Sequence, residues 1–138
     1  MLFRSYAVRD IQETAAPYVA AGWELSEVYN EEVQHAKIAF LKKEGMPTIE
    51  LVSPLEGESP VDKFLVNGGV QPYHICYIVE DIWAALEDLH EEGFMPLFMP
   101  VASVAMHDKQ ICYLYNKSVG LIEIVEKLNQ KIWKEVKF

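Results

Sequence analysis

The sequence predicts an α+β fold in which two tandem βαβββ modules form one curved, half-barrel mixed sheet. Two observations carry this prediction. The chain of 138 residues contains an internal repeat that covers most of its length. Within each copy, one stretch with the apolar spacing of a helix stands among several stretches with the apolar pattern of strands.

Three pairs of segments carry the repeat, and they occur in the same order in both copies. YAVRDI recurs as YIVEDI, AKIAFL as KQICYL, and TIELV as LIEIV. Because the order is kept, duplication explains the repeat better than chance. The repeat predicts a first module over residues 1–54, a linker with a short helix over 55–72, a second module over 73–126 and an amphipathic tail over 127–138.

The first copy begins with a strand at about residues 3–9 and continues into a helix that Asp10 and Glu13 open as a capping box. Gly22 ends this helix. Pro17 is expected to kink or split it, because proline removes one helical hydrogen bond. Three further strands are predicted at about 24–29, 35–42 and 47–53.

The linker and the second copy follow the same logic. Ser59 is the expected cap of a short helix that has Pro60 in its first turn. The second copy opens with a strand at about residues 73–80, Asp81 caps the next helix, and Gly93 ends it. Three strands are then predicted at about 96–101, 109–115 and 119–126.

Composition disfavours several classes of function. The formal net charge of −9 repels a phosphate backbone, so no nucleic-acid partner is expected. No apolar run approaches the roughly 18 residues of a membrane span, and the N-terminus becomes charged before a signal-peptide core could form. Cys76 and Cys112 form no CxxC pair and lie in apolar strand patterns, which predicts reduced core thiols in a cytoplasmic protein.

Two glutamates interrupt apolar strands at matching positions of the two copies. Glu123 lies in GLIEIVE and Glu50 in TIELV, and a buried carboxylate without a partner costs several kcal/mol. The repeat makes Phe3 and His74 equivalent in the same way. If the copies pack around a pseudo-two-fold axis, the four positions converge at the centre of the sheet. An imidazole and carboxylates would form a divalent-metal site there.

Several runs resemble one known superfamily. HICYIVEDI and LIEIVE, together with two βαβββ copies, are similar to the vicinal oxygen chelate superfamily, which includes glyoxalase I, bleomycin and fosfomycin resistance proteins and extradiol dioxygenases. The runs IELVSPLEGESPVDKFLVNGG, YHICYIVEDI and CYLYNKSVGLIEIVE are most similar to its methylmalonyl-CoA epimerase-like branch. The resemblance covers essentially the full chain and implies a glyoxalase-like fold.

The resemblance also implies a metal site. Carried over position by position, the ligands would be His74, Glu50 and Glu123, with Phe3 where the family has a histidine. A phenyl ring cannot ligate a metal, so the expected divalent ion (Co, Mn, Ni, Zn or Mg) would be bound weakly or be absent. The loop at 33–35 reads Val-Gln-His where the family tends to read EQG, with Glu31 and Glu32 nearby, so the resemblance does not carry over an acid from this loop.

The activity that the resemblance implies is metal-assisted removal of a proton alpha to a carbonyl, by an isomerase (epimerase) or a glyoxalase-like lyase. Glu123 and Glu50 are the expected acid and base. The substrate would be an acyl-CoA thioester or a 2-oxo compound, and the protein a homodimer. The expected pocket residues are Phe3, Cys76, Tyr113, Met106 and Lys117.

A second interpretation stays open on sequence alone. The chain would then be a non-catalytic small-molecule binding or sequestration protein with a degraded metal site, in which Phe3, Trp23 and a methionine-rich loop hold an apolar ligand. The other histidines, at positions 35, 90 and 107, are expected in loops or at the surface.

Overall fold

A computed structural model describes residues 3–56 and 59–127, so the predicted tail lies outside the described residues except for Lys127. From the N-terminus the elements are β1 (Phe3–Ala7), α1 (Ile11–Ala20), β2 (Glu24–Leu25), β3 (Tyr29–Glu31), β4 (Ala36–Lys42), β5 (Ile49–Pro54), α2 (Pro60–Gly68), β6 (Gln71–Val79), α3 (Ile82–Glu91), β7 (Met95–Pro96), β8 (Val101–Ser103), the 3-10 turn η1 (Val104–Met106), β9 (Lys109–Asn116) and β10 (Gly120–Glu126).

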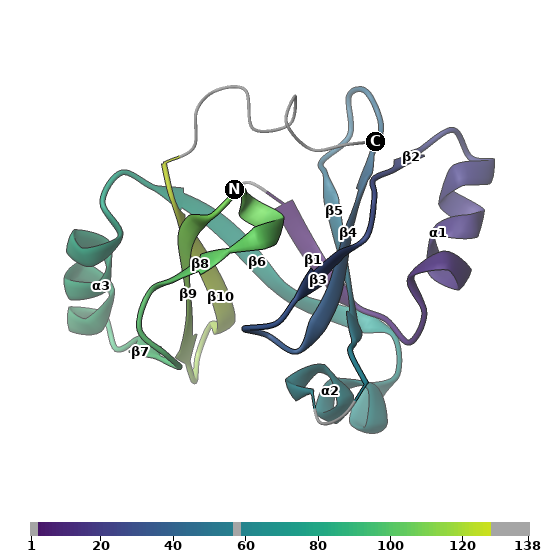
Figure 1. The fold of residues 1–138 in the computed structure, drawn as a ribbon. Helices are drawn as coiled ribbons and strands as arrows, with labels where there is room; N and C mark the ends of the chain where they lie inside the picture. Colours follow the sequence, from purple (N-terminus) through teal and green to yellow (C-terminus); the bar gives the residue numbers. More distant parts are fainter. Residues whose placement is uncertain (1–2, 57–58, 128–138) are drawn as a thin grey trace.

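The strands form one curved mixed sheet of ten strands in the order β2-β4-β5-β1-β6-β10-β9-β7, with β3 paired to β4 and β8 to β9 (Figure 1). The order is symmetric about its middle. β1 runs parallel to β5, β6 runs parallel to β10, and β1 and β6 meet as an antiparallel pair. The predicted fold class is confirmed.

The strand predicted at about 24–29 is two short strands, β2 and β3. Its interruption lies at Ser26, whose backbone N–H donates to the Phe40 carbonyl while its hydroxyl accepts from the Phe40 N–H at 2.8 Å. A side chain therefore takes the place of a backbone carbonyl, and regular pairing stops. The strand predicted at about 96–101 is also two, β7 and β8, because Pro96 and Pro100 have no N–H to donate.

The helices begin where the sequence indicates. Asp10 accepts from the Glu13 N–H at 2.9 Å, and Asp81 accepts from the first-turn N–H groups of α3. Ser59 caps α2 in a reciprocal capping box with Asp62. The expected split at Pro17 is wrong: α1 is continuous, and the exposed proline costs it a single hydrogen bond. None of the described helices is long and apolar enough to cross a bilayer.

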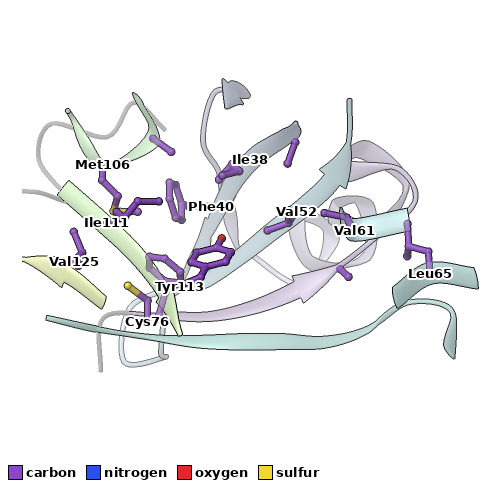
Figure 2. Close-up of a cluster of buried hydrophobic side chains, with 14 residues drawn as sticks. Ile38, Phe40, Val52, Val61, Leu65, Cys76, Met106, Ile111, Tyr113 and Val125 are labelled. Atoms are coloured by element: carbon purple, nitrogen blue, oxygen red, sulfur yellow. The ribbon is translucent and has the colours of Figure 1, made fainter. Parts of the chain in front are cut away.

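Three apolar clusters hold the sheet. The clusters around Ile11 and Ile82 lie between the sheet and the outer helices α1 and α3. The largest cluster fills the inner face and combines side chains from both halves of the chain, including Phe40 and Tyr113 (Figure 2). Burial of this shared interior stabilises the contact between the halves, because apolar area removed from water contributes about 25 cal/mol per Å².

Candidate metal centre

The register of the sheet brings the candidate ligands onto neighbouring rows of its inner face. In one row, Ser5 of β1 is paired with Glu50 of β5 and with His74 of β6. In the next row, Cys76 of β6 is paired with Glu123 of β10. His74 and Cys76 are two residues apart on one strand, so both rows face the same side.

A bulge between β1 and β6 adds an aromatic side chain to this group. Ser5 is paired with His74 and Tyr6 with Pro72, which leaves Tyr73 as an extra residue. The Tyr73 ring centroid lies 4.9 Å from that of His74. Two consecutive residues of β6 therefore pack at one site, which a regular strand would not allow.

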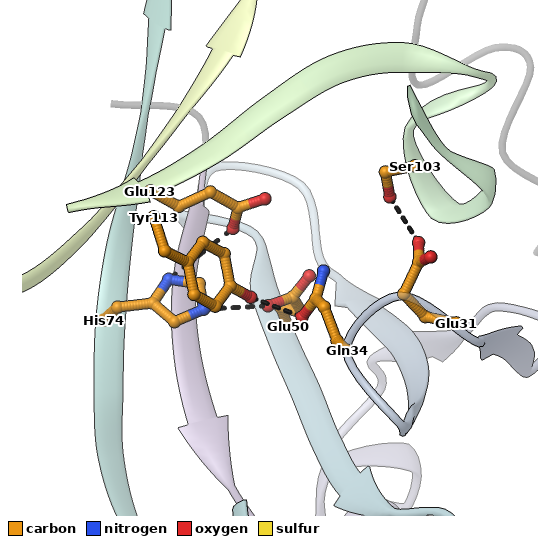
Figure 3. Close-up of polar contacts among 7 residues, drawn as sticks. All are labelled: Glu31, Gln34, Glu50, His74, Ser103, Tyr113 and Glu123. Atoms are coloured by element: carbon orange, nitrogen blue, oxygen red, sulfur yellow. Dashed lines mark hydrogen bonds and ion pairs between the residues drawn. The ribbon is translucent and has the colours of Figure 1, made fainter. Parts of the chain in front are cut away.

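The imidazole of His74 lies between two carboxylates (Figure 3). Its Nε2 is 3.7 Å from Oε1 of Glu50, and its Nδ1 is 3.6 Å from Oε2 of Glu123. All three side chains are at most 2% exposed. These four atoms make no hydrogen bond within the described residues. Buried polar atoms without partners are rare in native proteins, and a ligand placed between these side chains would satisfy them.

Burial sets the protonation states of the group. Desolvation raises the pKa of Glu50 from 4.5 to about 8, the Ser5 hydroxyl opposes this rise, and the charge of Glu31 adds to it. Desolvation and the charge of Glu50 raise the pKa of Glu123 well above its usual value. Desolvation lowers the pKa of His74 to about 3. The metal-free group is therefore neutral or nearly so near pH 7.

The three residues fit a divalent cation. One ligand atom from each lies within 4.8 Å of the others. Nitrogen and oxygen atoms that share an ion at about 2.0–2.2 Å are separated by roughly 4.3 Å at most, so a small inward shift satisfies the geometry. One imidazole and two carboxylates are a donor set that borderline and hard cations accept. A cation would also satisfy the unpaired atoms.

The fourth predicted position, Phe3, is fully buried on the same face and contributes no ligand. Its ring centroid lies 5.5 Å from that of Phe40 and 6.4 Å from that of His74. Phe3 is paired with Cys76 across the β1–β6 seam, so it stands beside the candidate ligands. In the first half, the position equivalent to His74 therefore holds Phe3, which packs in the apolar inner face.

The other predicted pocket residues are divided by the structure. Cys76, Met106 and Tyr113 are buried in the inner cluster. Lys117 lies in the exposed turn between β9 and β10 and is not part of that cluster. Of the remaining histidines, those at positions 35 and 90 are exposed and the one at 107 is half-buried, all three outside the metal group.

Sequence analysis did not assign Gln34, Glu31 or Ser103 to the site, and all three take part in contacts across the inner face. Gln34, at the β3–β4 turn, accepts a short hydrogen bond from the Tyr113 hydroxyl. Glu31, at the end of β3, accepts from the Ser103 hydroxyl at 2.5 Å (Figure 3). Each bond joins the first half of the chain to the second. A glutamate flanked by polar turn residues gives no sequence signal of burial, so only the fold reveals these contacts.

The fold and the centre together define a class: small α+β proteins whose paired modules surround a candidate metal site in the hollow of a curved sheet. The model of the Glyoxalase/Bleomycin resistance protein/Dioxygenase superfamily matches residues 5–113, and the chain belongs to this superfamily.

Individual relatives agree with this assignment. The chain is 34% identical over 124 residues to the ethylmalonyl-CoA/methylmalonyl-CoA epimerase of Cereibacter sphaeroides, covering 86% of this chain and 90% of the relative. A hypothetical protein of Bacillus halodurans has a TM-score of 0.80, 30% identity and coverage of 94% and 96%. A Streptomyces coelicolor methylmalonyl-CoA epimerase variant in complex with 2-nitronate-propionyl-CoA has the same fold, with a TM-score of 0.78, 24% identity and coverage of 92% and 96%.

Proposed function

We propose that this protein is an epimerase-like enzyme that removes a proton alpha to the thioester carbonyl of an acyl-CoA. The observation that carries the proposal is the buried group of Glu50, His74 and Glu123, with unpaired polar atoms at the centre of the sheet. The relative from Cereibacter sphaeroides, an epimerase of such thioesters, supports the substrate class. A 2-oxo compound remains the second substrate class to test.

Glu50, His74 and Glu123 would hold the divalent ion. When bound, such an ion supplies a positive charge that stabilises the enolate oxygen formed when the alpha proton leaves. The aromatic wall of Phe3, Tyr73 and Tyr113 would exclude water from the reacting carbon. Desolvation raises the pKa of Tyr73 to about 12, so its phenol stays a neutral hydrogen-bond donor.

A sequestration protein with a degraded metal site is not favoured. A protein that had lost its ion would be expected to replace or pair the buried ligands, because leaving such groups unpaired costs about 1–3 kcal/mol each. Here three buried ligands remain together, with four unpaired atoms between them. The loss of a histidine at Phe3 therefore changes the strength of the site rather than removing it.

Metal analysis and proton exchange test the proposal. Purified protein should be stabilised against heat by cobalt, manganese, nickel or zinc. With the ion present it should exchange the alpha proton of methylmalonyl-CoA or a 2-oxo acid in deuterated water. His74→Ala should lose both properties, whereas His90→Ala, at an exposed position of α3, should keep both. Absence of stabilisation by every ion, together with absence of exchange, would refute the function.

A further inference from the structure

A groove on the outer face of the sheet runs beside α3, on the opposite side of β10 from the candidate metal centre (Figure 1). Its volume is about 420 Å³, and it is lined by Ile122 and Ile124 of β10 and by Leu89 of α3. Tyr77 and Val119, which also line it, are 40% and 61% exposed. Contiguous apolar surface that is open to water is a feature of interaction sites, so an occupant of this groove is expected.

The helix beside this groove carries an excess of negative charge. Residues 80–92 hold six acidic side chains and no lysine or arginine. Four of the acids, at positions 87, 88, 91 and 92, lie at the C-terminal end of α3, where the helix dipole disfavours negative charge and the i, i+4 pairs repel each other. Among the described residues, only Glu80 of the six has a cation within 4 Å. An occupant that carries positive charge would therefore relieve this repulsion.

The sequence that follows the described residues has the complementary character. Residues 128–138 read LNQKIWKEVKF, with three lysines against one glutamate and with Leu128, Ile132 and Val136 spaced by four. In a helix, this spacing places the three apolar side chains on one side. Eleven helical residues span about 16 Å, which is enough to follow the ten residues of α3 along the groove.

The last described residues bring the chain to one end of this groove. Glu126, at the end of β10, is paired with Val79, which lines the groove. Lys127 then forms an ion pair with Glu80, with 3.1 Å between Nζ and Oε1. Glu80 directly precedes Asp81, the cap of α3. Residues 128–138 therefore start beside both the apolar surface and the acidic helix, and they reach them without a connecting loop.

We propose that residues 128–138 fold back along the groove between α3 and β10 of the same chain. Their apolar side, Leu128, Ile132 and Val136, packs on the apolar residues of the groove, and their lysines lie beside the acids of α3. The segment then covers the outer side of the strand that holds Glu123 on its inner side. This proposal is independent of the proposed function.

Amide hydrogen exchange of the full chain, followed by mass spectrometry of its peptides, tests the docking. The amides of residues 129–138 should exchange at least about tenfold more slowly than those of an unstructured chain. Ile132→Glu places a charge on the apolar side of the segment, so it should abolish this protection and speed exchange in α3. Gln130→Glu adds the same charge on the opposite side and is the matched control, with protection within about twofold of the wild type. Ile132→Ala covers the case in which Ile132→Glu does not fold.

A change on the groove side tests the location. Asp88 is exposed on α3 and lines the groove, so Asp88→Lys should repel the basic segment and lower its protection by at least about threefold at low salt. Glu27→Lys makes the same change of charge in an exposed loop of the first half and should leave the protection unchanged.

Three results would overturn the proposal. The first is exchange of residues 129–138 at the rate of an unstructured chain. The second is protection that survives Ile132→Glu or is unchanged in Asp88→Lys, which would place the segment elsewhere on the molecule. The third is protection that disappears when the protein is diluted about a hundredfold, which would show that the segment docks on a second copy of the chain. Protection that is independent of concentration, lost in Ile132→Glu and kept in Gln130→Glu would support it.

Discussion

At the scale of single residues, Phe3 is the position at which the internal repeat sets an apolar side chain opposite a candidate ligand. The duplication makes Phe3 the counterpart of His74, and the structure places both on one face with ring centroids 6.4 Å apart. The phenyl ring packs on Phe40 and closes the interior. Equivalent positions of the two halves thus hold a candidate ligand, His74, and an apolar packing residue, Phe3.

Phe3→His should add a fourth ligand. Without metal the variant should be less stable than the wild type, because an imidazole replaces a well-packed ring in an apolar site. With cobalt or zinc it should bind the ion at least about tenfold more tightly. Titration calorimetry measures the affinity, and Phe3→Leu, which keeps the site apolar, is the control. An unchanged affinity would show that position 3 does not face the ion.

The titration of the centre predicts how stability depends on pH. The pKa of Glu50 is raised from 4.5 to about 8, so its contribution to stability is full below pH 4.5 and is lost as pH rises through about 8. Glu123 shifts in the same direction. The pKa of His74 is lowered from 6.5 to about 3, so its contribution is present above pH 6.5 and is lost as pH falls towards 3.

Between about pH 6.5 and 8 only the two carboxyls act, so the melting temperature of metal-free protein should fall across this window. A saturating divalent ion should remove the fall, because it binds the ionised carboxylates and releases their protons. Thermal unfolding with and without a chelator measures both effects. Glu50→Gln should make the metal-free profile less steep, because Glu123 alone then titrates in this window, and a wild-type profile that is already flat would contradict the assignment.

The sequence predicted Glu50, His74 and Glu123 because the repeat compares each strand with its own copy. It did not predict Glu31 or Tyr73. The first is buried by a contact between distant halves, and the second reaches the site through a bulge. Neither feature leaves a pattern in the residues beside it, because bulges and cross-sheet contacts depend on register rather than on local preference.

At the scale of elements, the turn between β3 and β4 covers the candidate centre. The three ligands are at most 2% exposed, so a substrate reaches them only if a covering segment moves. The hydrogen bonds of Glu31 with Ser103 and of Gln34 with Tyr113 hold this turn against the second half of the chain. Sequence patterns placed the helices and long strands well, but not the short strands beside this turn.

Tyr113→Phe should make the covering turn open more often. Loss of one buried hydrogen bond costs about 1 kcal/mol, which corresponds to roughly a fivefold change in the open population. Cys76 is buried beside Glu123 and reports the opening through its rate of alkylation in a Cys112→Ser background. Tyr115→Phe, on the same strand but exposed, is the matched control and should label at the wild-type rate. Equal rates in both variants would argue against this cover.

At the scale of the whole molecule, the two halves meet along the antiparallel pair of β1 and β6 and share the inner cluster. The inner cluster is made of side chains from both halves, so neither half buries it alone. The predicted order of strands and helices followed from the duplication. The pairing of β1 with β6 could not be predicted from local patterns. Such patterns locate the strands, but they do not indicate which strand of one module pairs with which strand of the other.

A shared interior predicts that the halves unfold together. Trp23 packs in the first half and Trp83 lies on α3 of the second. Denaturant titrations of two variants that each keep one of these tryptophans, with Trp133 also replaced, should give coincident midpoints, because the transition is cooperative. Two separate midpoints would show that the halves are independent folding units.

The symmetric seam has a consequence for recombination. Because the centre draws ligands from both sides of the seam, a chimera that joins residues 1–70 of this chain to the second half of a relative would inherit one carboxylate from each parent. Its assembly would depend on partners that must match across the join: the acid at 31 with the hydroxyl at 103, and the amide at 34 with the phenol at 113. Hybrids between members of this superfamily should therefore assemble more readily when both of these pairings are kept.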